Sequence, residues 1–336
     1  MNRTEQGEVV GQLVRLLGEH YVFPEVAAAL AGPLSARMTD TPAASGPDPD
    51  GPDGPDGPDG LPAFAAAVTG DLQSVNGDRH LRLIHHPEAL PEGFGEDDVD
   101  IAWMRRWADS TGGGIGRVQR LPGNVGYLDI WPVLFPPAVA GDAMCAAMNL
   151  LAGTEALLID LRRCLGGEPG MVALACGYLF DSEPVELSGI YRRTTDRVDQ
   201  SWTPPYLPGR RYGATRPVYL LTSATTFSGA EQLAYDLQRL GRAKVIGERT
   251  RGGAHPRRGF RVHPHLEATI PVARAVDPVT GGNWEGTGVA PDIEAASADA
   301  PRVAYRLALD HIIAAGTAGA DVLAEARAAG DDPFGA

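Results

Sequence analysis

The chain has 336 residues, 43% of them hydrophobic, which is enough for one large core or two modest ones. Its net charge of -14 argues against nucleic acid or an anionic membrane surface as a partner. Its three cysteines are an odd number without a CxxC spacing, which argues against a disulfide framework or a zinc site, so we expect no metal and no cofactor.

The hydropathy pattern predicts neither export nor membrane insertion. The first residues are a polar lead into an amphipathic segment and lack the apolar centre of a signal peptide. No apolar run has the roughly 20 residues that a membrane-spanning helix needs. We therefore expect a cytoplasmic protein without a membrane span, while the sequence gives no indication of its oligomeric state.

The N-terminal part of the sequence has a helical pattern. Val9, Leu13 and Leu16 recur at helical spacing, and the apolar pattern continues through residues 23–34. After a polar interruption, residues 61–75 predict another helix, with a proline in its first turn. We expect these helices to form a small N-terminal bundle, so that residues 1–80 make one domain.

A Gly-Pro-Asp repeat interrupts this helical domain. Residues 46–60 contain no apolar side chain, so the segment has nothing to bury and cannot build a helix or a strand ladder. Four repeats with aspartate in the third position are too few for a collagen-like helix. We expect a disordered insertion that the fold tolerates.

From residue 124 onward, strands and helices alternate. Continuous apolar runs predict strands that are buried on both faces, and the alternation predicts an α/β core with parallel pairing and right-handed crossovers. Beyond residue 258 the pattern favours antiparallel strands and turns, and the chain ends in helices. We expect residues 81–336 to form this core, with strands at 124–130, 155–161, 216–223 and 243–248 and helices at 138–153, 169–180, 228–241, 302–316 and 321–329.

Ser228 lies where a predicted buried strand ends and a helix begins. Functional groups of α/β cores collect at such carboxyl ends, and the amide of Gly229 is one of the unpaired donors of the first helical turn, which could stabilise an oxyanion. Ser228 and Glu231 also have the spacing of a capping box. From this stretch alone, a helix cap and a nucleophile both remain open.

Three other segments contain residues suited to acyl transfer. Gly166 and Gly167 follow a buried strand and let backbone amides approach a ligand. His80 follows the helical domain, and Glu285 lies among glycines in the segment "NWEG". Each could be structural, but together with Ser228 they are the parts of a nucleophilic site.

His255 in "GGAHP" is a competing base. The proline that follows it predicts a rigid turn, so we expect a structural role for this histidine. Its replacement by alanine should then leave substantial turnover.

These segments carry a family resemblance, and the stretch from 222 to 256 is highly specific. The chain resembles the tail-specific protease superfamily, which includes C-terminal processing peptidases and the tricorn core, in the branch of interphotoreceptor retinoid-binding protein. The segments that match, in order, are "HYVFPEVAAAL", "GDRHLRL", "NVGYLDI", "DLRRCLGG", "TSATTFSGAEQLAYDLQRLGRAKVIGERTRGGAHP" and "NWEGTGVAPDI".

The resemblance implies a crotonase/Clp-like spiral α/β core, built of repeated strand-strand-helix units, behind a small helical domain. Processing peptidases of this superfamily also carry a PDZ domain, but the stretch between His80 and Val125 is too short for one. We therefore expect no PDZ domain.

The resemblance also implies roles for individual residues. It makes Ser228 the nucleophile, with backbone donors at Gly229, Gly166 and Gly167. The lysine of the serine–lysine enzymes would fall at Gly253, so we expect the tricorn-type arrangement instead, in which His80 is the base and Glu285 supports the site. Cys164 stands where the family has asparagine in the glycine turn, which leaves the fine geometry of that turn open.

We therefore expect a serine hydrolase of peptidase type that acts by acyl transfer on a peptide, a peptide-like compound or a small apolar substrate. Two alternatives remain open. One is a non-catalytic binder of hydrophobic small molecules, and the other is a specialised enzyme, such as a cyclase or hydratase, that uses the same cavity.

Overall fold

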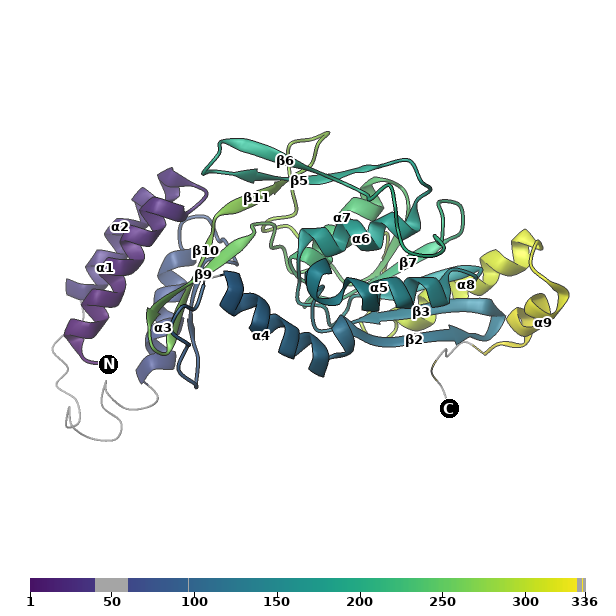
Figure 1. Cartoon of the computed structure of the whole chain (residues 1–336), viewed down its shortest axis with the longest axis horizontal. Helices are drawn as coiled ribbons and strands as arrows, with labels where there is room; N and C mark the ends of the chain where they lie inside the picture. Colours follow the sequence, from purple (N-terminus) through teal and green to yellow (C-terminus); the bar gives the residue numbers. More distant parts are fainter. Residues whose placement is uncertain (40–59, 96, 331–333, 335–336) are drawn as a thin grey trace. The chain divides into compact units, whose positions relative to one another are not determined.

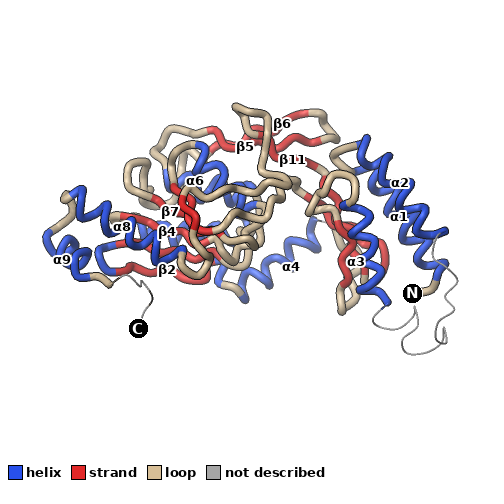
Figure 2. The backbone as a smooth tube through the Cα atoms, turned by 180° about the vertical axis from the view of Figure 1, so that it is seen from behind, coloured by secondary structure: helices blue, strands red, loops and turns tan. Residues whose placement is uncertain are grey.

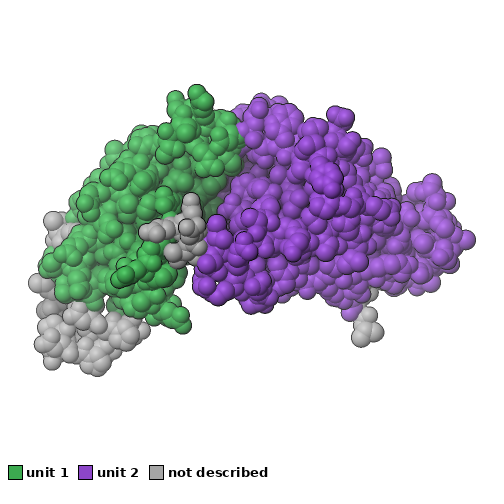
Figure 3. All heavy atoms as spheres, viewed as in Figure 1, with its two compact units in different colours: residues 1–100, 190–199, 255–275 green, residues 101–189, 200–254, 276–336 purple. Residues whose placement is uncertain are grey.

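The computed structural model describes residues 1–39, 60–95, 97–330 and 334. The chain divides into two compact units, coloured separately in Figure 3. The expected Gly-Pro-Asp insertion lies outside the described residues, apart from Gly60, which begins a helix. Unit 1 consists of residues 1–100, 190–199 and 255–275, and unit 2 of residues 101–189, 200–254 and 276–336.

Unit 1 packs helices against an antiparallel sheet of three strands in the order β1-β10-β9 (Figures 1 and 2). The side chain of Asn2 begins the first helix by accepting hydrogen bonds from the amides of Thr4 and Glu5. The elements are α1 (Arg3–His20), α2 (Pro24–Thr39), α3 (Gly60–Gln73), β1 (Arg82–His85), β9 (Arg257–His263) and β10 (Leu266–Pro271).

The sheet is the part of unit 1 that the helical pattern did not predict. Leu266, Ala268 and Ile270 alternate along β10 and join the core formed by the helices, because alternate residues of a strand face the same side. Unit 1 thus includes two later segments, residues 190–199 and 255–275, besides residues 1–100. Strands β9 and β10, which come much later in the sequence, complete it, because β10 pairs with β1 and β9 pairs with β10.

Unit 2 is built on a sheet with the strand order β12-β8-β7-β4-β3-β2, of which β2, β3 and β7 are labelled in Figure 1. β3, β4, β7, β8 and β12 are parallel, and β2 pairs antiparallel with β3 at the edge. The expected α/β class with parallel strands is thereby confirmed. The strands are β2 (Ile115–Leu121), β3 (Val125–Ile130), β4 (Ala156–Asp160), β7 (Val218–Thr222), β8 (Lys244–Gly247) and β12 (Ile293–Glu294).

Helices cover both faces of this sheet. Tyr127, Leu158 and Leu221 pack against α8 on one face, whereas Gly126, which faces the other way, lies against Leu151 of α5. Every residue of β3, β4 and β7 is buried, which explains their continuous apolar runs. The helices are α5 (Pro137–Leu151), α6 (Pro169–Leu179), α7 (Gly229–Arg239), α8 (Ala300–Ala315) and α9 (Ala320–Ala328).

The boundary between the units runs through several elements. Strands β5, β6 and β11 form a small sheet in the order β11-β5-β6, and each has residues in both units. None of the helices in the described ranges is long and apolar enough to cross a membrane. The remaining elements are α4 (Asp97–Ser110), two short 3₁₀ turns (Gly112–Gly114 and Pro122–Asn124), β5 (Glu186–Arg192), β6 (Arg197–Trp202) and β11 (Ala273–Val276).

Candidate active site

Ser228 has a backbone conformation that an ordinary helix cap does not need. It lies between β7 and α7 with φ 53° and ψ -121°, which is the conformation of the first central residue of a type II′ turn, a position that glycine usually occupies. Among the described residues, the other non-glycine residues with positive φ are Asn124 and Asp196, whose residue types tolerate such angles. Strain of this kind gathers at functional sites.

The glycine turn at residues 166–167 packs directly against Ser228. A Cβ atom added to Gly166 would lie 2.9 Å from the Cβ of Ser228, and one added to Gly229 would lie 2.4 Å from the carbonyl oxygen of Gly167. Gly166 and Gly167 have φ of 130° and 134°, which only glycine adopts without strain. Four of the predicted site residues, Ser228, Gly229, Gly166 and Gly167, are therefore brought together.

The backbone of this glycine turn is arranged to leave donors for a ligand. The amides of Leu165 and Glu168 donate to the carbonyls of Pro132 and Leu134. Gly166 and Gly167 lie between these two residues, and their amides donate to no residue in the described part of the chain. Ser228 is itself half-buried. The turn can thus offer backbone N–H groups beside Ser228, which is an arrangement suited to an oxyanion site.

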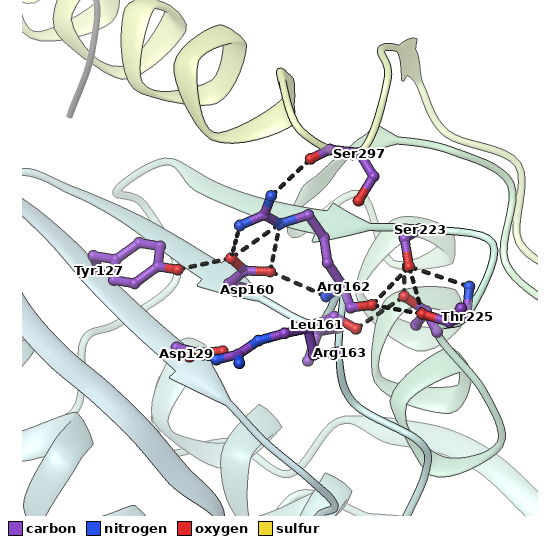
Figure 4. A network of polar contacts seen from close by, with 10 residues as sticks. Tyr127, Asp129, Asp160, Leu161, Arg162, Arg163, Ser223, Thr225 and Ser297 are labelled. Carbon is purple, nitrogen blue, oxygen red and sulfur yellow. Dashed lines mark hydrogen bonds and ion pairs between the residues drawn. The ribbon is translucent and has the colours of Figure 1, made fainter. Parts of the chain in front are cut away.

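The hydroxyls that precede Ser228 tie its turn to the end of β4 (Figure 4). The side chains of Ser223 and Thr225 both donate to the carbonyl of Arg162, at 2.6 and 2.9 Å. Thr226 donates to the carbonyl of Leu161 at 2.9 Å. These hydrogen bonds therefore hold the turn between β7 and α7 against residues 161–162, which lead from β4 to the glycine turn.

A second set of polar contacts fixes the start of that segment (Figure 4). The guanidinium of Arg162 binds both carboxylate oxygens of Asp160 and donates to the carbonyl of Ser297 at 2.7 Å. The hydroxyl of Tyr127 donates to the same aspartate at 2.7 Å. Such bidentate pairing holds the backbone in one arrangement, so that the chain leaves β4 in a fixed direction.

Cys164, which stands where the resemblance leads us to expect asparagine, has a contact within the glycine turn. Its thiol donates to the carbonyl of Gly166, with a sulfur–oxygen distance of 3.5 Å. The side chain is fully buried, and this burial raises the pKa of the thiol to about 12. Cys164 therefore stays protonated and acts as a weak donor that supports the turn.

Glu231 links Ser228 to a second loop, residues 250–253. Its fully buried carboxylate accepts hydrogen bonds from the amides of Ser228, Gly252 and Gly253 at 2.8, 2.6 and 2.8 Å, and from the hydroxyl of Thr250 at 2.5 Å. Burial raises the pKa of this carboxyl, and the four hydrogen bonds oppose that rise. The sequence showed this residue only as part of a capping box, because its partners in the loop lie about twenty residues further along.

Glu285 lies on a loop that packs against the same segment. Its carboxylate accepts a hydrogen bond from the amide of Ala254, and the indole of Trp284 donates to the carbonyl of Gly253 at 2.8 Å. A chain of hydrogen bonds therefore runs from Ser228 through Glu231 and residues 253–254 to Glu285. All of these residues belong to unit 2.

The two candidate histidines belong to unit 1, and both contact Asp78. His80 is buried; its amide donates to one carboxylate oxygen of Asp78 at 3.0 Å, and its carbonyl accepts from Thr269 at 2.6 Å. The ring of His255 is bonded through Nδ1 to the other oxygen of Asp78 at 2.7 Å. Asp78 was not among the predicted site residues, because nothing in the sequence shows that it meets a histidine so far along the chain.

Comparison with known families matches residues 124–295 to the model of peptidase family S41. The chain belongs to peptidase family S41. This family consists of serine-type peptidases, and the match covers the parallel strands, the glycine turn, Ser228 and the loop of Glu285. The expected membership of the tail-specific protease superfamily is confirmed.

Solved structures show how widely the fold is shared. A protein from Parabacteroides merdae named as a candidate peptidase has 16% identity and a TM-score of 0.55, over 88% of this chain and 90% of its own. A lipoprotein from Streptococcus agalactiae has 13% identity and a TM-score of 0.52, over 86% and 92%. The photosystem II D1 C-terminal processing protease has 19% identity and a TM-score of 0.42 over 55% of this chain. The chain spans only 48% of the length of that protease. At these identities, the first two likenesses show a shared fold and nothing further.

Proposed function

We propose that this S41 family member hydrolyses peptides or peptide-like substrates through a covalent acyl-enzyme formed on Ser228. The observation that carries the proposal is the strained conformation of Ser228 against the glycine turn, with φ of 53° at the serine and a distance of 2.9 Å from its Cβ to a Cβ built on Gly166. A serine that only capped a helix would have an extended backbone without this strain.

The proposed reaction begins with attack of Ser228 Oγ on the substrate carbonyl. A bond forms between Oγ and the carbonyl carbon, and the electron pair of the carbonyl moves onto its oxygen, where the amides of Gly229, Gly166 and Gly167 stabilise it. A histidine accepts the hydroxyl proton and later gives it to the leaving amine as the carbon–nitrogen bond breaks. Water then hydrolyses the acyl-enzyme by the same steps.

The resemblance supplies His80 as the histidine and Glu285 as a supporting carboxylate, and both assignments are part of this proposal. Glu285 is supported by its hydrogen-bonded connection to Ser228 within unit 2. For His80, the support is the "GDRH" motif and the hydrogen bond that holds its backbone to Asp78.

Exposed apolar side chains beside the glycine turn favour a substrate with an apolar residue. Leu165 and Trp131 are 53% and 39% exposed, and the amide of Leu165 donates to the carbonyl of Pro132, the residue after Trp131. Large apolar side chains that remain exposed commonly mark binding surfaces. We expect peptides with a bulky apolar residue near the scissile bond to be cleaved best.

The test is turnover of a mixed peptide library, with the products identified by mass spectrometry. Ser228→Ala should abolish cleavage, whereas Ser110→Ala, which alters an exposed serine at the end of α4, should not affect it. Because nucleophile and base act together, adding His80→Ala to Ser228→Ala should cost little more. If Ser228→Ala cleaves like the wild type, the enzyme works without a covalent step on Ser228. If the wild type itself cleaves no peptide, the binder of apolar molecules is favoured instead.

A further inference from the structure

Arg251 places a guanidinium beside the proposed nucleophile. Its Cζ atom lies 4.7 Å from the centre of the ring of Phe227, the residue directly before Ser228. All three residues belong to unit 2. A guanidinium is planar and positively charged, so it is attracted to the electron-rich face of an aromatic ring. The stacked pair therefore places a positive charge against the side chain that precedes Ser228.

Backbone contacts hold the loop of Arg251 against the turn of the nucleophile. The amide of Arg251 donates to the carbonyl of Thr226 at 3.0 Å. The amides of Ser228 and Gly252 both donate to the carboxylate of Glu231, at 2.8 and 2.6 Å. The loop and the turn are thus joined directly and through Glu231, so the backbone of Arg251 stays beside the turn.

A guanidinium in this position is suited to bind a carboxylate. Stacking uses the face of the guanidinium plane, whereas the five N–H donors lie along its edge, and two of them suffice for a bidentate bond with a carboxylate. Arg251 and Phe227 are both half-buried, so water screens the attraction between opposite charges less than it does at an exposed site. We propose that Arg251 binds a carboxylate of the substrate close to the bond that Ser228 cleaves.

This carboxylate site rests on the proposed function and is a second determinant of the substrate. Leu165 and Trp131 lie beside the glycine turn, whereas Arg251 belongs to the loop after β8, so one substrate can meet both through different residues. The chain as a whole repels an acidic substrate, because its net charge is -14. A preference for a carboxylate therefore has to come from a local positive charge, which Arg251 supplies.

The test compares kcat/KM for synthetic peptides that share one sequence cleaved in the library. They differ by a glutamate, a glutamine or a lysine close to the cleaved bond. The wild type should favour glutamate over glutamine by about tenfold or more, the scale of one charge-assisted pair. Arg251→Met should abolish this preference, and Arg251→Glu should favour lysine instead.

Arg249→Met is the matched control. It removes an exposed arginine of the same loop, whose guanidinium donates to the carbonyl of Thr287 at 3.2 Å. Because it makes the same change in net charge as Arg251→Met, it should keep the preference of the wild type. Loss of the preference in both variants would show that net charge, and not the position of Arg251, selects the substrate.

A fluorophosphonate probe, which bonds covalently to an activated serine, first checks that Ser228 reacts in each variant. If Arg251→Met is misfolded or unreactive, Arg251→Lys replaces it. This variant keeps the charge but loses the planar fork of donors, so its preference for glutamate should fall below that of the wild type.

Two kinds of carboxylate fit the site, an acidic side chain and the C-terminal carboxylate of a peptide, so each peptide is made with a free and with an amidated end. A preference for glutamate among amidated peptides assigns the side chain, and faster cleavage of free ends without glutamate assigns the terminus. Equal kcat/KM of the wild type for all these peptides, or a preference that survives in Arg251→Met, would overturn the role of Arg251. A wild type that cleaves no peptide and gains no fluorophosphonate adduct would overturn the proposed function itself.

Discussion

Ser228 combines two roles that the sequence could not separate. Its amide donates to Glu231, as in a capping box, so the helix start needs this turn. Its positive φ, however, is not required by capping, and it places the serine against Gly166. The spacing of Ser228 and Glu231 is visible in the sequence, whereas the positive φ of Ser228 is a property of the folded turn. This φ angle is what favours a role for Ser228 as the nucleophile.

Gly166 offers a test at the scale of a single residue. In Gly166→Ala, the new Cβ would lie 2.9 Å from that of Ser228, at a φ of 130° that alanine adopts only with strain. We expect a loss of more than about 1 kcal/mol in unfolding free energy and a much larger loss in labelling of Ser228, because the amides of the turn move. Thermal unfolding and labelling rates measure the two effects.

Gly153→Ala is the control for this prediction. Gly153 is exposed, and a Cβ added there meets nothing within 4 Å. If Gly166→Ala labelled as fast as Gly153→Ala, the glycine turn would have no part in the reaction.

At the scale of elements, the junction between β7 and α7 depends on a loop far along the chain. Glu231 accepts four hydrogen bonds without exposure to solvent, and three of their donors come from residues 250–253. The sequence predicted β7, α7 and β8 close to their observed bounds, because each has its own apolar period. It could not predict which side chain would satisfy the amides of the loop, since that depends on packing.

Glu231→Gln should therefore destabilise the protein strongly. The new amide group would face N–H donors, and each buried donor left without an acceptor costs about 1–3 kcal/mol. We expect a clearly lower midpoint of thermal unfolding and little labelling of Ser228. Glu8→Gln on the exposed face of α1 is the matched control. Equal unfolding midpoints for the two variants would show that the hydrogen bonds of Glu231 do not stabilise the fold.

The sheet of unit 1 should respond to acid through His263, the last residue of β9. Burial lowers the pKa of His263, and the charge of His265 lowers it further, together with those of Arg261 and the N-terminus, while Glu5 opposes them. A folded-state pKa below the unfolded value of about 6.5 means that the unfolded chain binds the proton more tightly, so stability falls as pH drops below that value.

His263→Gln should reduce this sensitivity. Between pH 7.5 and 5, its unfolding midpoint should fall less than that of the wild type, measured by calorimetry in matched buffers. Equal falls for both proteins would show that His263 does not contribute.

At the scale of the whole molecule, the sequence predicted the α/β core but not the pairing of β10 with β1. The core strands are buried on both faces and show as continuous apolar runs. Strand β10 pairs with β1, which lies about 180 residues earlier in the sequence, and nothing local reveals such a partner. The same limit applies to the site, where Ser228 and the glycine turns were visible as motifs, whereas the contact between Asp78 and His255 was not.

The Gly-Pro-Asp segment should matter little to the stability of the whole protein. Because residues 46–60 contain no apolar side chain, they have nothing to bury in a core, and we expect their deletion to change the unfolding midpoint little. A loss on the scale of a core truncation, about 2–5 kcal/mol, would show instead that the segment is packed.

The central claim is that Ser228 is the nucleophile, and covalent labelling tests it most directly. The wild type and Ser228→Ala would be treated with a fluorophosphonate, weighed intact by mass spectrometry and then digested to locate the adduct. We predict a single adduct on the peptide that contains Ser228 in the wild type and none in the variant. An adduct on another residue, or a wild type that cleaves peptides but gains no adduct, would contradict the account.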